Sequence, residues 1–293
     1  MRISNSVEKD DVGWVDLIAI HSDTIYAMTQ YKGFASYDGN WKKIDISTKK
    51  IGNYTYNSTA NKIFFITDDG ANAYIYDLDS TTSSPSVIDL ADKEILSSSR
   101  YNFVLVKEDD GSYTVYEFDG SDFTNEVNLG IDLTSAQLIA SDDSNWIVSA
   151  KDKTDNKYYA YYNGNVGVDI SNPIVAMGVN ALDDVITIDS EGNIYTYDDI
   201  EKEFNKVDGS SITLFERTSD NLPYPSFVYD GSLYIQNGSY DIYSIKIDDG
   251  ELTKEDGKFS DISKASIRIK SYLLDGSTLY LGTYANGIME ITL

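Results

Sequence analysis

The stretch that decides the fold is the last one in the chain, DGSTLYLGTYANGIMEITL, residues 275–293. Two runs of strand-forming residues, TLYLGT and GIMEITL, flank a short turn that contains Asn and Gly, which predicts an antiparallel hairpin. The chain ends directly after the second run, and this would leave one side of an apolar strand without a partner. Because an open strand edge invites aggregation, we expect another segment of the chain to cover it.

The same strand–turn–strand unit occurs seven times. In each copy the first strand opens on one apolar residue, and these anchors are Ile25, Ile63, Phe103, Trp146, Val185, Leu233 and Leu279. The anchors are spaced by 38, 40, 43, 39, 48 and 46 residues. A mean period of about 42 residues is typical of a propeller blade of four strands.

Each hairpin has a further strand on either side. Outer strands follow the hairpin, as in WKKIDI (41–46), PSVIDL (85–90) and FTNEVNL (123–129). Innermost strands precede it, as in VDLIAI (15–20), QLIAS (137–141), IVAMGV (174–179), SFVYD (226–230) and SYLLD (271–275). Four strands per copy at this period predict a sheet that stacks against its neighbours through both faces.

The seventh copy lacks its outer strand, and the N-terminus holds a spare one, RISNSV, Arg2 to Val7. We therefore predict an all-β, seven-bladed β-propeller of four-stranded antiparallel blades, formed by residues 1–293 as a single domain. The last blade is closed by the N-terminal strand beside GIMEITL, which removes the open edge. Rings of six or eight blades are the alternatives.

Composition excludes several classes of function. The net charge is −25, from 23 Lys and Arg against 48 Asp and Glu, and a surface this acidic is expected to repel nucleic acid and anionic membranes. Without cysteine the chain has no disulfide and no Cys-based zinc site. No apolar run approaches the roughly 18 residues of a membrane span, so membrane insertion is not expected.

The first eleven residues contain no apolar stretch of a signal peptide. We expect an extracellular or cell-surface protein whose leader is absent from this chain, with the cytoplasm as the alternative. A monomer is expected.

Two stretches resemble known repeats. LYLGTYANGIMEI (279–291) looks like the repeats of two-component-regulator-type propellers, and YYAYYNG (158–164) resembles propeller repeats common in exported Gram-positive proteins. The resemblance covers essentially the whole chain. It implies a bacterial β-propeller repeat architecture. It assigns no functional residue in this chain, because fold does not imply function.

Catalytic and metal-binding motifs are few. His21 is the only histidine, and because no Gly-x-Ser-x-Gly elbow accompanies it, we interpret it as a turn residue. Acidic loops such as DKTDNK (152–157) and DSEGN (189–193) do not match the spacing of an EF-hand, and side-chain-capped turns explain them. We predict no catalytic residue, no metal ligand and no required cofactor, while calcium held by acids from several blades stays possible.

The longest interruption of the repeat is DGSSITLFERTSDNLPYPS, residues 208–226. It lies on the side of the blades where the turn inside each hairpin also lies, and loops that break a repeat often carry ligand sites. An arginine among tyrosines on such a surface could bind a carboxylate, a sugar or a peptide. The predicted ligand-binding residues are Arg217, Phe215, Tyr224, Tyr31, Tyr240 and Tyr284.

Three functional hypotheses follow. The favoured one is a non-catalytic binding or scaffold propeller, exported or attached to the cell surface, which binds a protein or a glycan on one face. The alternative is a calcium-dependent lactonase-like or carbohydrate-active enzyme with acidic residues in the central channel, so an enzymatic role stays open. The sensor region of a larger signalling protein ranks third.

Overall fold

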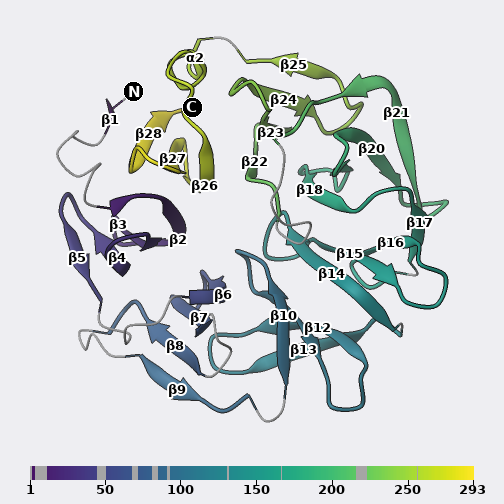
Figure 1. Ribbon diagram of the computed structural model, residues 1–293, viewed down its shortest axis with the longest axis horizontal. Helices are drawn as coiled ribbons and strands as arrows, with labels where there is room; N and C mark the ends of the chain where they lie inside the picture. Colours follow the sequence, from purple (N-terminus) through teal and green to yellow (C-terminus); the bar gives the residue numbers. More distant parts are fainter. Residues whose placement is uncertain are drawn as a thin grey trace. The chain divides into compact units, whose positions relative to one another are not determined.

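The computed structural model describes residues 2–3, 12–44, 51–67, 72–80, 85–90, 93–130, 132–165, 167–215, 223–255 and 257–293. Within these residues the strands form seven antiparallel sheets of four strands each (Figure 1). Seven such sheets in sequence order are the blades of a seven-bladed β-propeller. The predicted fold class is therefore confirmed over the alternatives of six or eight blades.

In every blade but the last, four consecutive strands run from the innermost to the outermost position. The bounds are, for blade one, β2 (Val15–His21), β3 (Thr24–Thr29), β4 (Gly33–Tyr37) and β5 (Trp41–Lys43); for blade two, β6 (Ile51–Asn57), β7 (Lys62–Thr67), β8 (Ala73–Asp77) and β9 (Ser86–Ile88); for blade three, β10 (Glu94–Ser98), β11 (Phe103–Lys107), β12 (Tyr113–Phe118) and β13 (Phe123–Asn128); for blade four, β14 (Leu133–Ala140), β15 (Trp146–Asp152), β16 (Tyr158–Tyr162) and β17 (Val168–Ile170); for blade five, β18 (Ile174–Val179), β19 (Val185–Asp189), β20 (Asn193–Asp198) and β21 (Glu203–Ser211); for blade six, β22 (Ser226–Tyr229), β23 (Ser232–Gln236), β24 (Ile242–Lys246) and β25 (Leu252–Lys254).

Blade seven is completed by the N-terminal strand, as the sequence predicts. Its order is β1 (Arg2–Ile3), β28 (Ile288–Thr292), β27 (Thr278–Thr283) and β26 (Ile269–Asp275), from outside to inside. The backbone of β1 pairs antiparallel with β28, with Arg2 opposite Glu290 and Ile3 opposite Met289 (Figure 1). The outer edge of β28 is thereby covered along these residues, although the predicted strand continues to Val7 beyond the described residues.

The chain divides into two compact units. The first comprises Met1–Val106, Tyr116–Glu126 and Ile267–Leu293, and the second comprises Lys107–Val115 and Val127–Ser266. Blades one, two and seven belong to the first unit, and blades four, five and six belong to the second.

Within each unit the core lies between neighbouring sheets. In the first unit, Leu17 and Ile25 of blade one cluster with Leu273 and Ile288 of blade seven. In the second unit, one cluster joins blades four and five, and another joins blades five and six. Both faces of a blade are covered in this arrangement, which explains why strands such as KIFFIT and FVLVK are apolar at successive positions rather than alternating.

Serine hydroxyls join the innermost strands of neighbouring blades. The Ser271 hydroxyl of β26 accepts a hydrogen bond from the Leu17 N–H of β2 at 2.8 Å and donates to the Val15 carbonyl at 3.0 Å. Ser98 of blade three accepts from the Tyr54 N–H of blade two at 2.8 Å. These contacts satisfy backbone groups that the sheet's own ladder leaves free at these positions.

One short helix, α2 (Ser260–Lys264), follows β25 in the second unit. It packs through the buried side chain of Ile262, and the preceding Phe259 ring lies 6.0 Å from the ring of Tyr234. This helix was not predicted from the sequence, because its five residues are too few for a recognisable periodicity.

Candidate functional site

Three of the predicted ligand-binding residues come together in the second unit. The Phe215 N–H donates to the Tyr224 hydroxyl at 3.0 Å, and the rings of Phe215 and Tyr240 meet edge to face at 5.1 Å. Tyr224 is only 7% exposed, so its hydroxyl serves the fold here. Arg217, the cation of the predicted site, lies outside the described residues. Its place beside these aromatic residues stays a prediction.

The other two predicted residues are exposed tyrosines in the first unit. Tyr31 follows β3 and Tyr284 follows β27, and they are 64% and 44% exposed. Blades one and seven are neighbours, because β2 packs against β26, and the two turns lie at the same end of their blades. The Arg268 guanidinium carbon lies 4.6 Å from the centre of the Tyr284 ring, which holds that ring in place by a cation–π contact.

The acidic loops are turns capped by their own side chains, as predicted. The Asp189 carboxylate accepts hydrogen bonds from the N–H groups of Glu191 and Asn193 at 3.0 and 2.9 Å. Asp152 accepts from the Thr154 N–H at 2.5 Å. Among the described residues, no group of three or more His, Asp or Glu side chains is arranged to hold a metal ion. The calcium-dependent alternative stays a prediction.

His21 ends β2, in the turn that the sequence predicts for it. Its Nε2 lies 2.9 Å from an Asp79 carboxylate oxygen and 3.2 Å from the Ser22 hydroxyl. A Ser-His-Asp triad needs the serine and the aspartate on different ring nitrogens, so that a proton can pass through the imidazole. Here both partners lie on the same ring nitrogen, Nε2, so the arrangement is not that of a triad.

Two exposed aliphatic side chains in blade five were not predicted from the sequence. Leu182, between β18 and β19, is 81% exposed, and Ile200, between β20 and β21, is 89% exposed. Both turns lie at the same end of the blade, since the strands alternate in direction. They are separated by two inter-strand spacings, about 10 Å. We call these two turns, residues 180–184 and 199–202, the blade-five tip.

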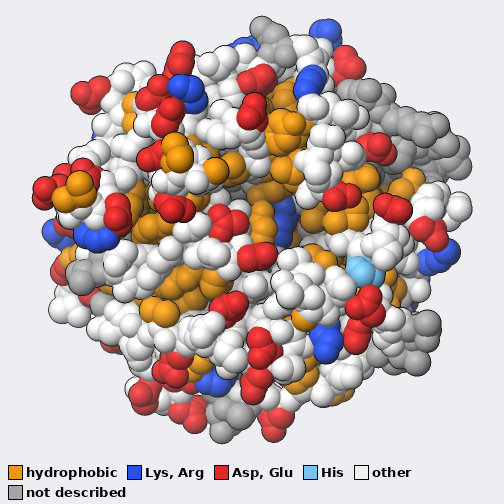
Figure 2. Space-filling model, turned by 180° about the vertical axis from the view of Figure 1, so that it is seen from behind, with side chains coloured by type: hydrophobic (Ala, Val, Ile, Leu, Met, Phe, Trp, Pro, Cys, Tyr) orange, Lys and Arg blue, Asp and Glu red, His pale blue; other side chains and the backbone are white. Residues whose placement is uncertain are grey.

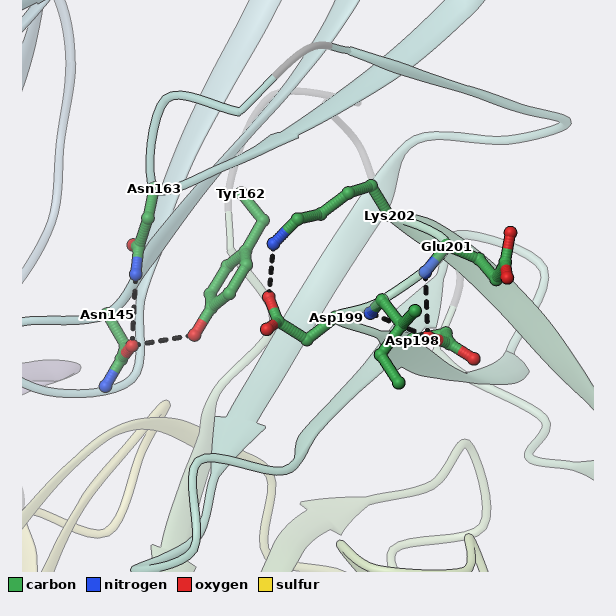
Figure 3. Close-up of polar contacts among 8 residues, drawn as sticks. Asn145, Tyr162, Asn163, Asp198, Asp199, Glu201 and Lys202 are labelled. Atoms are coloured by element: carbon green, nitrogen blue, oxygen red, sulfur yellow. Dashed lines mark hydrogen bonds and ion pairs between the residues drawn. The ribbon is translucent and has the colours of Figure 1, made fainter.

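Both turns are held by side-chain caps. The Asn180 amide oxygen accepts from the N–H groups of Leu182 and Asp184 at 2.8 and 3.1 Å. The Asp198 carboxylate accepts from the N–H groups of Ile200 and Glu201 at 2.8 and 3.0 Å (Figure 3). Capped turns lose little conformational entropy on binding. The tip therefore presents two aliphatic side chains on fixed backbone.

Carboxylates surround the tip. The turns at this end of blades four and five contain one basic residue, Lys202, and seven acidic residues. The acidic residues are Asp142, Asp143, Asp183, Asp184, Asp198, Asp199 and Glu201. Lys202 is paired with Asp199 at 2.5 Å (Figure 3). Figure 2 shows acidic side chains scattered across one whole face of the molecule, with hydrophobic side chains between them and few basic ones.

Tyrosines join blades four and five beside the tip. The Tyr162 hydroxyl donates to the Asn145 amide oxygen at 2.7 Å (Figure 3). The Tyr162 ring meets that of Tyr197 at 5.0 Å. Burial, with a smaller contribution from the charge of Asp142, raises the pKa of Tyr162 to about 12. The hydroxyl is therefore protonated at neutral pH and acts as a fixed donor.

No protein-family model and no curated protein matches this chain. The resemblance to two-component-regulator-type repeats therefore stays a prediction. Solved structures do resemble it. YCF48 bound to D1 peptide aligns over 97% of this chain and 93% of its own, with a TM-score of 0.55 and 9% identity. YCF48 from Cyanidioschyzon merolae aligns over 96% and 95%, with a TM-score of 0.57 and 13% identity. At such identities the likeness concerns the fold alone.

The described residues include no helix that is long and apolar enough to cross a membrane.

Proposed function

We propose that the protein is a non-catalytic propeller that binds a segment of another protein at the blade-five tip. The observation that carries the proposal is the pair Leu182 and Ile200, both more than 80% exposed on capped turns. Soluble proteins tolerate single exposed aliphatic residues. Two on rigid turns of one blade, with carboxylates on both sides, form an apolar contact with a charged rim, which is the anatomy of a protein interface.

The charge of the rim indicates the chemistry of the partner. Seven carboxylates against one lysine attract a segment rich in Lys or Arg. Apolar side chains of that segment would cover Leu182 and Ile200, and full burial of each is worth about 1.5–3 kcal/mol. The apolar contacts determine how long the complex lasts, while the carboxylates mainly raise the association rate and make it depend on salt.

The fold is compatible with this role, since a YCF48 structure of the same architecture holds a peptide. That peptide belongs to the YCF48 complex, and here it supports only the idea that a propeller of this size can bind a peptide. A glycan ligand and an exported location, which the sequence analysis also expects, remain further proposals. They find no specific support at the tip, where aromatic rings are not the exposed groups.

A random 12-residue peptide library displayed on phage tests the proposal against the full chain at physiological ionic strength. We expect enriched peptides to combine Lys or Arg with Leu, Ile or Phe. The double variant Leu182→Ser/Ile200→Ser keeps every charge. It should weaken the binding of the best peptide at least about tenfold for each residue replaced. The control is Val87→Ser, which removes another exposed aliphatic side chain, 70% exposed on blade two.

Three outcomes would contradict the proposal. They are the absence of enrichment, the enrichment of acidic peptides, and unchanged binding by the Leu182→Ser/Ile200→Ser variant. A parallel variant, Tyr31→Ser/Tyr284→Ser, tests the tyrosine surface that the sequence analysis predicts. Loss of binding in that variant alone would move the binding site to the hairpin turns of blades one and seven.

A further inference from the structure

A partly buried arginine in the first unit has no role in the proposed protein binding. Arg100 lies between β10 and β11, and its carbonyl oxygen accepts from the Tyr56 N–H at 3.3 Å. Its guanidinium carbon lies 3.9 Å from the centre of the Tyr272 ring of β26. The arginine of blade three therefore reaches the innermost strand of blade seven, and its planar head is stacked on an aromatic face.

This guanidinium is not satisfied by its surroundings. Its Nη1 is buried, and within the described part of the chain it has no hydrogen-bond partner. Leaving a buried donor without an acceptor is unfavourable, and more so when the donor is charged. Buried donors in proteins are normally hydrogen-bonded, so an Nη1 without a partner indicates that an acceptor from outside the chain belongs there.

Asp16 is the carboxylate of the described residues whose charge acts on Arg100, and it is already engaged. Asp16 of β2 accepts from the Tyr54 hydroxyl at 3.3 Å through one oxygen and from Lys270 at 3.1 Å through the other. Arg100 interacts electrostatically with the same carboxylate. Among these described groups two cations therefore share one anion, and one positive charge is left over. In a chain of net charge −25, this local excess of positive charge runs against the composition of the whole molecule.

Phenol groups surround the excess charge. Tyr54, Tyr101 and Tyr272 are the tyrosines whose electrostatic interaction with Arg100 opposes the cost of its burial, so that the pKa of Arg100 lies above its usual value. Burial, followed by the charge of Asp16, raises the pKa of Tyr54. Its hydroxyl stays protonated at neutral pH and donates to Asp16.

We propose that Arg100, with Lys270 and the tyrosines Tyr54 and Tyr272, forms a binding site for the carboxylate of a small organic acid. A planar guanidinium presents paired N–H groups that match a planar carboxylate. The single excess charge fits a monoanion, whereas a phosphate dianion would leave a net negative charge beside Asp16. The aromatic rings provide an apolar surface for the organic part of the ligand.

Titration of the uniformly ¹⁵N-labelled full chain with sodium benzoate tests this site by NMR. The chain has only four arginines, Arg2, Arg100, Arg217 and Arg268, so the arginine Nε–Hε signals can be assigned individually. We expect the Arg100 signal to shift saturably with a Kd of about 1 mM or tighter, the range of one charge-assisted contact in a partly buried site. Sodium chloride at equal ionic strength should leave it in place.

Two matched variants locate the ligand. Arg100→Gln should abolish saturable binding, while Arg268→Gln, which removes the same charge from another tyrosine-stacked arginine, should not change it. Arg100→Lys keeps the charge but loses the planar head, and it should weaken binding at least tenfold. The titration of the unmodified chain decides the question even if Arg100→Gln does not fold.

Four results would overturn the proposal. The first is an Arg100 signal that has not shifted when benzoate reaches 20 mM, a concentration about twentyfold above the expected Kd. The second is an equal shift with chloride, and the third is tighter binding of phosphate than of benzoate. The fourth is loss of benzoate binding in Arg268→Gln. A short peptide acid tested in place of benzoate identifies the source of the carboxylate. Tighter binding of benzoate than of the peptide acid is expected for a free organic acid, and the reverse overturns that choice of source.

Discussion

Replacing Ser271 by alanine tests how neighbouring blades are joined. The Ser271 hydroxyl is buried, accepts from the Leu17 N–H at 2.8 Å and donates to the Val15 carbonyl at 3.0 Å. Leu17 is fully buried, so without the hydroxyl its N–H finds no water. An orphaned buried donor costs about 1–3 kcal/mol and the lost donated bond about 1 kcal/mol. The expected loss in the free energy of unfolding is therefore ~2–4 kcal/mol.

Urea denaturation followed by tryptophan fluorescence and circular dichroism measures this loss. Since 1 kcal/mol corresponds to roughly 2–4 °C in a domain of this size class, the melting temperature should fall by about 4–16 °C. Ser277→Ala is the matched control, because Ser277 is exposed in the turn between β26 and β27 and its loss should change the free energy of unfolding by less than about 0.5 kcal/mol. A loss below about 1 kcal/mol for Ser271→Ala would refute the reasoning, because the hydroxyl would then not join the two blades.

Two further predictions concern the second unit. A β-carbon at Gly192, where φ is +82°, would lie 1.8 Å from the Ile212 carbonyl oxygen, so Gly192→Ala should lower the free energy of unfolding by ~3 kcal/mol or more. Gly209→Ala, at a φ of +75° with open space around it, should cost only about 1 kcal/mol, and equal losses would be inconsistent with the clash. Burial raises the pKa values of Tyr162 and Tyr195 to about 12, above the value near 10 expected in the unfolded chain; the stability they contribute is fully present below pH 10 and is lost as pH rises to about 12. Absorbance at 295 nm with circular dichroism checks this, and titration of all tyrosines near pH 10 in the folded protein would contradict it.

The repeat could be predicted because its signal is local. Each hairpin has an apolar first strand and a turn of Gly, Asn or Asp, and these residues act on their immediate neighbours. Two innermost strands, β6 and β10, were not identified from the sequence. Their sequences, IGNYTYN and EILSS, contain few apolar residues, and several positions are only partly buried. These two strands are held in part by contacts with other blades, such as the hydrogen bond between Ser98 and Tyr54. A local sequence pattern does not reveal such contacts.

The candidate sites could be predicted only in part. The sequence identifies tyrosines at the hairpin turns, but it cannot tell that Tyr224 is buried while Tyr31 is exposed, because that depends on the neighbouring blade. Leu182 and Ile200 did leave a signal, a large aliphatic residue two positions after a capping Asn or Asp. Arg100 left none, because Tyr54 and Tyr272 come from distant parts of the chain.

The most direct test of the fold is a disulfide between the N-terminal strand and the last one. The chain has no cysteine, and the backbone register places Arg2 opposite Glu290, so directly paired positions are within disulfide reach. Arg2→Cys/Glu290→Cys should oxidise almost completely to an intramolecular disulfide, measured by free-thiol assay and gel mobility. Arg2→Cys/Thr292→Cys, displaced by two residues along the same face of β28, should stay largely reduced. Failure of the first pair to cross-link, or equal cross-linking of both pairs, would contradict a last blade closed by the N-terminal strand.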